Sequence, residues 1–317
     1  MIEAQNLSKQ YGEKAAVDSV TFTVQPGRVT GFLGPNGAGK STTMRMIMGL
    51  DNPSGGHVTV NGQPYAQHRA PLREVGALLD AKAVHTKRSA YDHLRSMAAT
   101  HGIPASRVKE VIELTGLGSV ANKRVGGFSL GMGQRLGIAA ALIGDPHTVI
   151  LDEPVNGLDP EGVQWVRHLA KDLASEGRTV FLSSHLMSEM ALTADHLIVI
   201  GRGRIIADAP IQTVIDGQGR ALARVRVRAD RPQDLIGSLA GEGVTAQILE
   251  PELVEITGVD ARRIAEIALR DRVLVYELTP LQLSLEDAYM QLTQDEVEYQ
   301  SQNPEPVTTI SATVEGR

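Results

Sequence analysis

The sequence predicts an α/β fold in which helices join parallel strands. The first observation is an apolar run at 28–34 that leads through a glycine-rich turn into a helical pattern at 40–50. The second is a pair of apolar β-type runs, 147–154 and 178–185, with a helical pattern at 163–177 between them. Strands that alternate with helices pair in parallel through crossover connections, so both observations indicate a parallel sheet.

Antiparallel strands are predicted before and after this region. Residues 1–12 and 15–27 show short alternating apolar runs that end in glycine, which is typical of antiparallel strands. Residues 88–117 follow a helical pattern that a glycine and a proline interrupt. Residues 197–210 have the pattern of a hairpin, and we expect it to close the first domain.

A second, smaller domain is predicted in the C-terminal third. Residues 210–219 are typical of a linker, and the strand and helix patterns beyond them indicate an α+β domain that ends in a helix at 283–293. From Glu296 the chain is polar, contains proline and lacks periodicity, so we expect disorder there. The predicted limits are 1–215 for the first domain, 220–295 for the second and 296–317 for a disordered tail.

The composition argues against several classes of protein. No stretch of the 317 residues approaches the ~18 consecutive apolar residues of a membrane span, and the N-terminus lacks the order of a secretory signal. We therefore expect a cytosolic protein. The absence of cysteine fits that compartment and excludes disulfides and thiolate sites. From Arg220 onward there are 10 arginines and no lysine against 17 acidic residues, and a polyanion-binding surface would need clustered basic residues. We therefore expect no nucleic-acid partner.

A phosphate-binding loop is predicted between the first apolar strand and its helix. The segment GPNGAGKS fits the pattern GxxxxGK(S/T), in which glycines let backbone amides surround phosphate oxygens. The lysine supplies a cation for the β and γ phosphates, the serine can bind Mg²⁺, and the helix adds its positive end. A structural glycine turn is the alternative, but the preceding strand and following helix favour ATP and Mg²⁺. The predicted nucleotide-binding residues here are Gly34, Pro35, Asn36, Gly37, Ala38, Gly39, Lys40 and Ser41.

An acidic pair supports this interpretation. Asp152 and Glu153 end the apolar strand TVIL, an arrangement that directs one carboxylate to Mg²⁺ and the next to an attacking water. Alone, such a pair is more often the start of a helix. Together with the phosphate loop it predicts nucleotide hydrolysis, with Asp152 as a metal ligand and Glu153 and Lys40 as catalytic residues.

The segment FSLGMGQRLGIAAAL at 128–142 suggests which family of phosphate-loop proteins this is. With GPNGAGKS and ILDEP, it resembles the signature of ATP-binding cassette (ABC) ATPases, whose usual form is LSGGQ followed by a helix. NGLDP at 156–160 is similar to the D-loop of that family, and FLSSH is similar to its switch-histidine strand. The resemblance implies a P-loop NTPase fold, an ABC nucleotide-binding domain with a RecA-like core, an antiparallel β subdomain and a helical insertion at about 83–145.

The resemblance also implies a site shared between two copies. In these ATPases two cassettes pair head to tail, and the signature of one covers the nucleotide held by the other. Ser129, Gly131 and Met132 would therefore lie against the γ-phosphate of a partner's ATP, and Asp159 would lie at the dimer interface. The usual signature has glycine and glutamine where this chain has Leu130 and Met132, so we expect the serine and backbone amides to be the donors.

Further roles follow from the same resemblance. Thr42 would hold a phosphate oxygen, His185 would contact the γ-phosphate and link it to Glu153, and Tyr11 would stack on adenine. Packing in a strand is the alternative for Tyr11. A hydrogen-bonded histidine at a strand end is the alternative for His185.

Asp80 departs from the family pattern. The segment EVGALLD aligns with the strand that ordinarily ends in the Q-loop glutamine, and Asp80 stands in that place. A carboxylate there could face Mg²⁺ through water, but it also adds negative charge beside ATP. Our hypothesis is a position close to the magnesium, and the alternative is a side chain displaced from the metal.

Because a single cassette without spans must act on something else, the resemblance implies a separate membrane permease. It would dock over the Q-loop and the helical insertion. In its motifs and domain order the chain looks like the ATP-binding subunits of bacterial drug and antibiotic exporters of the bacitracin and daunorubicin type, which have ABC-2-type permeases. We expect a homodimeric ATPase on the inner face of the cell membrane, with a regulatory or dimerisation role for the C-terminal domain. A lipid or polysaccharide exporter and a soluble, non-transport ABC ATPase are the alternatives.

Overall fold

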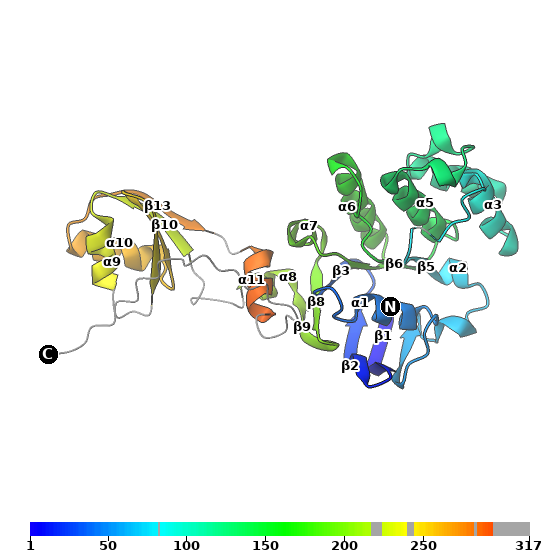
Figure 1. Cartoon of the computed structure of the whole chain (residues 1–317), viewed down its shortest axis with the longest axis horizontal. Coiled ribbons are helices and arrows are strands. Elements are labelled where there is room, and N and C mark those ends of the chain that lie inside the picture. The colour runs from blue at the N-terminus through cyan, green and yellow to red at the C-terminus, as the bar shows by residue number, and fades with distance from the viewer. Residues whose placement is uncertain (82, 217–223, 240–243, 282–283, 294–317) are drawn as a thin grey trace. The chain divides into compact units, whose positions relative to one another are not determined.

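The computed structural model describes residues 1–81, 83–216, 224–239, 244–281 and 284–293 and divides into two compact units (Figure 1). The first unit takes in the described residues up to Ile211 together with Leu292 and Thr293, and the second takes in those from Gln212 to Gln291. The domain limits drawn from the sequence stay predictions, and the predicted tail at 296–317 lies outside the described residues.

A three-stranded antiparallel sheet begins the first unit. Its order is β2 (Lys14–Val24), β1 (Ile2–Tyr11) and β4 (Gly55–Val60), with β1 in the middle. Ile2 and Ala4 on β1 are buried while Glu3 between them is partly exposed, because successive side chains of a strand point to opposite faces. The sequence predicts the first two strands and misses β4.

A six-stranded sheet forms the centre of the first unit. Five strands are parallel, and only the last is antiparallel to its neighbour, so the predicted parallel sheet and hairpin are both confirmed. Three of the strands are buried along their whole length, as expected for parallel strands covered on both faces. The order is β5 (Val75–Leu78), β6 (Thr148–Leu151), β7 (Thr179–Ser183), β3 (Arg28–Leu33), β8 (His196–Gly201) and β9 (Arg204–Pro210).

Helices complete the first unit. The predicted helical region 88–117 is two helices, because Gly102 takes a positive φ of 63° and Pro104 follows it. These two helices contact each other and α5, which in turn contacts β5 and β6 (Figure 1). The helices are α1 (Lys40–Ile47), α2 (Pro71–Glu74), α3 (Ala90–Thr100), α4 (Ala105–Leu114), α5 (Leu130–Leu142), α6 (Pro160–Ser175) and α7 (Met187–Thr193). A further helix, α8 (Ile211–Asp216), begins at the border of the first unit, and the rest of it belongs to the second.

Three phenylalanines join the antiparallel sheet to the central sheet. Phe32 lies 5.1 Å from Phe181 and 6.0 Å from Phe22, measured between ring centroids. Such aromatic pairs add about 0.5–1.5 kcal/mol each beyond the burial of their area. The same buried cluster includes Met44 and Ile47 of α1, so the segment between β3 and α1 is fixed at both ends.

The second unit has a hydrophobic core of its own. Its antiparallel sheet has the order β11 (Thr245–Glu250), β12 (Leu253–Thr257), β10 (Arg224–Ala229) and β13 (Val275–Leu281). Valines of β10 and Ile256 of β12 are buried with side chains of two helices, which gives the predicted α+β architecture. The helices are α9 (Pro232–Leu239), α10 (Ala261–Arg270) and α11 (Leu285–Leu292), and the last residue of α11 belongs to the first unit.

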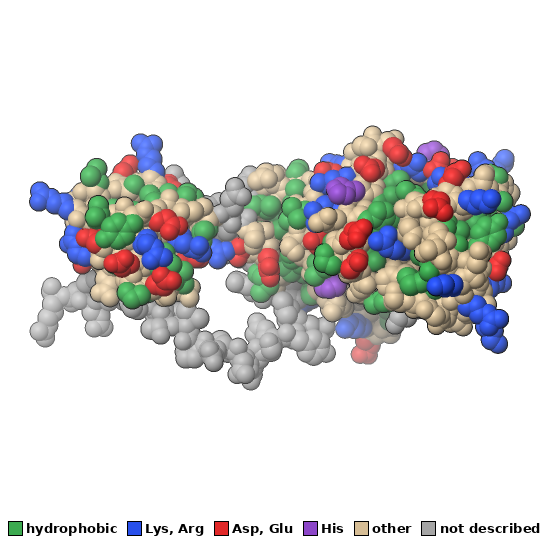
Figure 2. Space-filling model, turned by 90° about the horizontal axis from the view of Figure 1, so that it is seen from above, with side chains coloured by type: hydrophobic (Ala, Val, Ile, Leu, Met, Phe, Trp, Pro, Cys, Tyr) green, Lys and Arg blue, Asp and Glu red, His purple; other side chains and the backbone are tan. Residues whose placement is uncertain are grey.

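On the face drawn in Figure 2, neither unit has a surface of one charge sign in its described part. Acidic and basic side chains are interspersed there on both units. The helices in the described ranges are all too short or too polar to pass through a bilayer.

Candidate functional site

The loop between β3 and α1 forms a tight cradle. Gly39, immediately before α1, has a φ of 110°, and a Cβ atom at this position would lie 2.5 Å from the carbonyl oxygen of Ala16. Only glycine fits both requirements. Because no side chain caps α1, its first amides are open to a ligand, and a helix N-terminus favours an anion there.

Lys40 is a buried cation within this cradle. Its side chain is 7% exposed, and its Nζ donates to the carbonyl oxygens of Gly34 at 2.6 Å and Pro35 at 3.2 Å. Burial lowers the pKa of Lys40, and the negative charges of Glu153 and Asp152 partly offset that effect. An anionic phosphate would compensate the buried ammonium better than the two loop carbonyls do.

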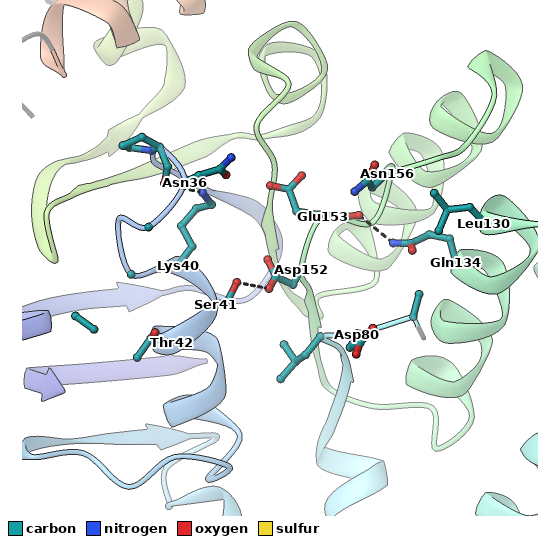
Figure 3. A pocket seen from close by; sticks show the side chains of 16 residues that line it. Asn36, Lys40, Ser41, Thr42, Asp80, Leu130, Gln134, Asp152, Glu153 and Asn156 are labelled. Carbon is teal, nitrogen blue, oxygen red and sulfur yellow. Dashed lines mark hydrogen bonds between the residues drawn. The ribbon is translucent and has the colours of Figure 1, made fainter. Parts of the chain in front are cut away.

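A cavity of about 390 Å³ opens in front of the cradle (Figure 3). The phosphate loop, the ends of β5 and β6, and the first turns of α5 all contribute to its wall. Ten predicted site residues line it: Pro35, Asn36, Gly37, Gly39, Lys40, Ser41, Thr42, Asp80, Asp152 and Glu153. The wall also includes Ala16, Leu79, Ala81, Leu130, Gln134 and Asn156, for which the sequence predicts no role.

Asp152 and Ser41 offer oxygen ligands side by side. Ser41 Oγ donates to Asp152 Oδ2 at 2.8 Å (Figure 3). Ser183 Oγ donates to Asp152 Oδ1 at 2.5 Å. Among the described residues, no group of three or more His, Cys, Asp or Glu side chains could hold a metal by itself. Two protein oxygens completed by phosphate and water suit Mg²⁺, which usually keeps several waters.

Glu153 is held at several points. Its φ is 50°, an uncommon conformation for a residue with a side chain. Its amide donates to Ser183 Oγ at 3.0 Å, and its carbonyl oxygen accepts from Gln134 Nε2 at 2.9 Å. Its carboxylate lies 2.7 Å from His185 Nδ1. The main chain and the side chain of Glu153 are therefore both fixed, with the carboxylate at the cavity.

The remaining predicted residues do not line this cavity. Ser129 caps α5 by accepting from the amide of Met132 at 3.2 Å, and Asp159 caps α6 by accepting from Gly162 at 2.9 Å. Tyr11 is 52% exposed. The residues of the prediction that do not line the cavity are Tyr11, Gly34, Ala38, Ser129, Gly131, Met132, Asp159 and His185. Their predicted roles stay predictions.

Two side chains with direct contacts to Glu153 were missed from the sequence. Ser183 stands two residues before His185, and β7 pairs in parallel with β6, whose end carries Asp152. Adjacent strand ends could therefore have pointed to Ser183. Gln134 gives no such signal, because only the folded position of α5 brings it to Glu153.

Comparison with known proteins gives two family matches and relatives of nearly full length. The ABC transporter family matches residues 17–156, and a "Domain of unknown function (DUF8746)" matches residues 223–286. An uncharacterized ABC transporter ATP-binding protein of Bacillus subtilis, YhcH, is 33% identical over 92% of this chain and 96% of its own. Nod factor export ATP-binding protein I of Rhizobium sp. is 31% identical over 94% of this chain and 98% of its own. The bacitracin transport ATP-binding protein BcrA of Bacillus licheniformis is 40% identical over 66% of this chain and 70% of its own.

Solved structures agree on the fold of the first unit. An ATP-binding subunit of an ABC transporter is 25% identical, with a TM-score of 0.64 over 69% of this chain and 93% of its own. The dimeric post-hydrolysis state of the cassette MJ0796, bound to ADP and Pi, has a TM-score of 0.61 at 21% identity, over 66% of this chain and 98% of its own. Both likenesses confirm the predicted P-loop NTPase fold.

Proposed function

Because this chain belongs to the ATP-binding proteins of ABC transporters, we propose that it is the ATP-hydrolysing subunit of an export system and drives a separate membrane permease. The observation that carries this proposal is the meeting of four residues at one cavity. Lys40 and Ser41 come from the phosphate loop, and Asp152 and Glu153 come from the end of β6. A phosphate cradle, two metal ligands and a carboxylate for water activation are thereby brought together.

Each residue at the cavity has a different role in the proposed hydrolysis. Lys40 and the loop amides bind the β and γ phosphates, and Thr42 adds a hydroxyl. A bound Mg²⁺ would be held by Ser41 and Asp152 and would neutralise negative charge on the phosphates. Glu153 orients the attacking water and takes its proton, while His185 keeps the carboxylate in place through their 2.7 Å contact. Asp80 lines the same cavity, and in this proposal it would act on the metal through water.

A second copy of the chain completes the site in this proposal. Ser129 is exposed at the start of α5, and its oxygen accepts from Met132, which leaves its hydroxyl hydrogen to donate outward. Together with the amide of Gly131 it would bind the γ-phosphate held by a partner, while the amide of Met132 orients the Ser129 hydroxyl toward that phosphate. Asp159 would contact the partner subunit, and Tyr11 would stack on adenine.

The permease and the cargo are inferred from the relatives. BcrA is named for bacitracin transport, which favours an ABC-2-type permease and the export of drugs or antibiotics. The chain would then lie on the cytoplasmic face of the membrane through its permease. The Nod factor export relative covers more of this chain, and it makes a cargo other than an antibiotic, such as a lipid or polysaccharide, the second candidate.

The Glu153→Gln variant tests the proposed ATPase and its dimer. We expect kcat to fall at least about a hundredfold, because the amide cannot take a proton from water. With ATP and Mg²⁺ the variant should elute as a dimer on size exclusion, since bound ATP is not consumed. Glu176→Gln, at the exposed C-terminal end of α6, is the matched control and should keep the parent activity. A Glu153→Gln protein that stays monomeric in saturating ATP contradicts the shared site.

A further inference from the structure

We propose that Gln134 is a positioning residue for Glu153, and that it thereby ties the tip of α5 to the hydrolytic carboxylate of the same protomer. The proposal rests on the proposed function, in which Glu153 orients the water and the tip of α5 covers a partner's nucleotide. Gln134 would act through Glu153 and would not touch the reacting atoms.

Gln134 is buried and makes a specific hydrogen bond to Glu153. It lies on α5, within two turns of the capping Ser129, yet its side chain is only 4% exposed. Its Nε2 reaches the carbonyl oxygen of Glu153 at 2.9 Å, across 19 positions of the sequence (Figure 3). A buried amide costs free energy unless it is hydrogen-bonded, so this bond holds both partners in place.

Glu153 is a residue whose position needs such support. A non-glycine residue with a φ of 50° is strained and persists only where its surroundings determine it. Ser183 holds the amide of Glu153 and Gln134 holds its carbonyl, so the two peptide groups beside its Cα are fixed from opposite sides. Loss of either bond lets the backbone rotate and moves the carboxylate.

The start of α5 also packs on the turn that follows Glu153. Gly157 has a φ of 75°, and a Cβ atom there would overlap the side chain of Leu130. A Cβ at Gly131 would lie 3.0 Å from the carbonyl oxygen of Gly157. Leu130 stands where related signatures have glycine, so in this chain apolar contact and the Gln134 bond together link the helix tip to the turn. In the proposed dimer, the residues around the nucleotide bound by one protomer are thus linked to the helix end that covers the nucleotide bound by its partner.

Steady-state kinetics of three variants of the full-length chain test the proposal. Gln134→Met keeps the side-chain length but has no donor, and we expect kcat to fall about tenfold while KM for ATP stays within about twofold. Gln134→His presents a ring Nε2–H at a similar reach and should return kcat to within about threefold of the parent. Gln63→Leu is the control, because it removes an amide bonded to His68 in the antiparallel-sheet region, away from the cavity.

Each outcome decides the proposal. If Gln134→Met keeps kcat within about twofold of the parent, or Gln134→His loses as much as Gln134→Met, the amide donor has no positioning role. A fall in kcat that merely follows a lower melting temperature, as the Gln63→Leu control would reveal, also overturns it. Failure of the proposed function gives a different result, because the parent protein would then show no ATPase activity.

Discussion

Ser183 connects the two carboxyl residues of the site. It is fully buried, donates to Asp152 Oδ1 at 2.5 Å and accepts from the amide of Glu153 at 3.0 Å. One hydroxyl therefore orients the proposed metal ligand and fixes the backbone of the proposed base. Because the hydroxyl both donates and accepts, no residue without that dual capacity can replace it.

Ser183→Ala should damage catalysis more than stability. The variant leaves the partly buried amide of Glu153 without its partner, which costs about 1 kcal/mol of folding free energy. We expect a fall in kcat of at least about tenfold, because the carboxylate of Asp152 and the backbone of Glu153 each lose an orienting bond. ATPase assays and thermal melts of the purified protein measure the two effects.

The neighbouring Ser184→Ala is the control for that experiment. Ser184 is also buried, at 3% exposure, and its Oγ accepts from the amide of Leu186 at 3.0 Å, away from both carboxyl residues. It should lose comparable stability with little change in kcat. Equal losses of kcat in the two variants would contradict the role given to Ser183.

The sequence predicts the residues that local motifs carry and misses those that depend on tertiary contact. Lys40, Ser41 and the acidic pair lie at strand and helix ends whose local order fixes their positions. Ser183 and Gln134 come to Glu153 only through the register of β6 against β7 and the packing of α5. The predicted order of parallel strands could have pointed to Ser183, but nothing in a single sequence points to Gln134.

Among the strands, too, the sequence predicts those with a strong local pattern and misses one that depends on tertiary pairing. Long apolar runs predict the parallel strands and the hairpin β8–β9 correctly, because burial of whole strands leaves a continuous pattern. β4 begins at Gly55, and two glycines and a histidine make up its first half, so its pattern is too weak to predict a strand. Its pairing with β1 supplies the stability that local propensity lacks.

Gly157→Ala should loosen α5 from the turn beside the cavity. The new methyl group meets Leu130, and an L-residue in the left-handed conformation costs about a further 1 kcal/mol. We expect a lower melting temperature and lower ATPase activity. Adding Leu130→Ala removes the clash, so the double variant should recover part of the stability, as a double-mutant cycle measures. Strict additivity of the two changes would mean that the side chains do not meet.

An ion cluster joins α4 to the loops beside the central sheet. Asp145 lies 3.3 Å from Arg107 Nη2 and 2.8 Å from Arg178 Nη1. Partial burial acts to raise the pKa of Asp145, but the hydrogen bond from Arg178 and the charges of both arginines outweigh it and lower the pKa. Since Asp145 is 58% exposed, the cluster contributes only about 0.5–1 kcal/mol.

Asp145→Asn should therefore lower stability at neutral pH and leave it nearly unchanged in acid. The depressed pKa contributes stability above the unfolded pKa, and that contribution disappears as the pH falls through the folded pKa. Asn is suitable because it tolerates the φ of 54° at this position. Urea unfolding at pH 7 and pH 3, followed by the fluorescence of Trp165, the one tryptophan of the chain, measures the difference. A gap between parent and variant that is equal at both pH values contradicts the ion-pair explanation.

At the scale of the whole molecule, two hydrophobic cores predict two unfolding events. The cluster around Phe22, Phe32 and Phe181 belongs to the first unit, and the cluster around Val227 and Ile256 belongs to the second. A unit with its own core can unfold as a unit. ATP should raise only the transition of the first unit, because the whole cavity lies within it and a ligand stabilises the state that binds it.

Matched substitutions distinguish the two events. Ile198→Ala and Ile256→Ala each truncate a fully buried isoleucine, one in each core, and each should destabilise its own unit by about 2–5 kcal/mol. Trp165 on α6 reports the first unit alone, whereas far-UV circular dichroism reports both. Ile256→Ala should therefore shift part of the dichroism transition, leave the fluorescence midpoint in place and preserve ATPase activity below that transition. A common shift of both signals by either variant would show that the two cores unfold as one.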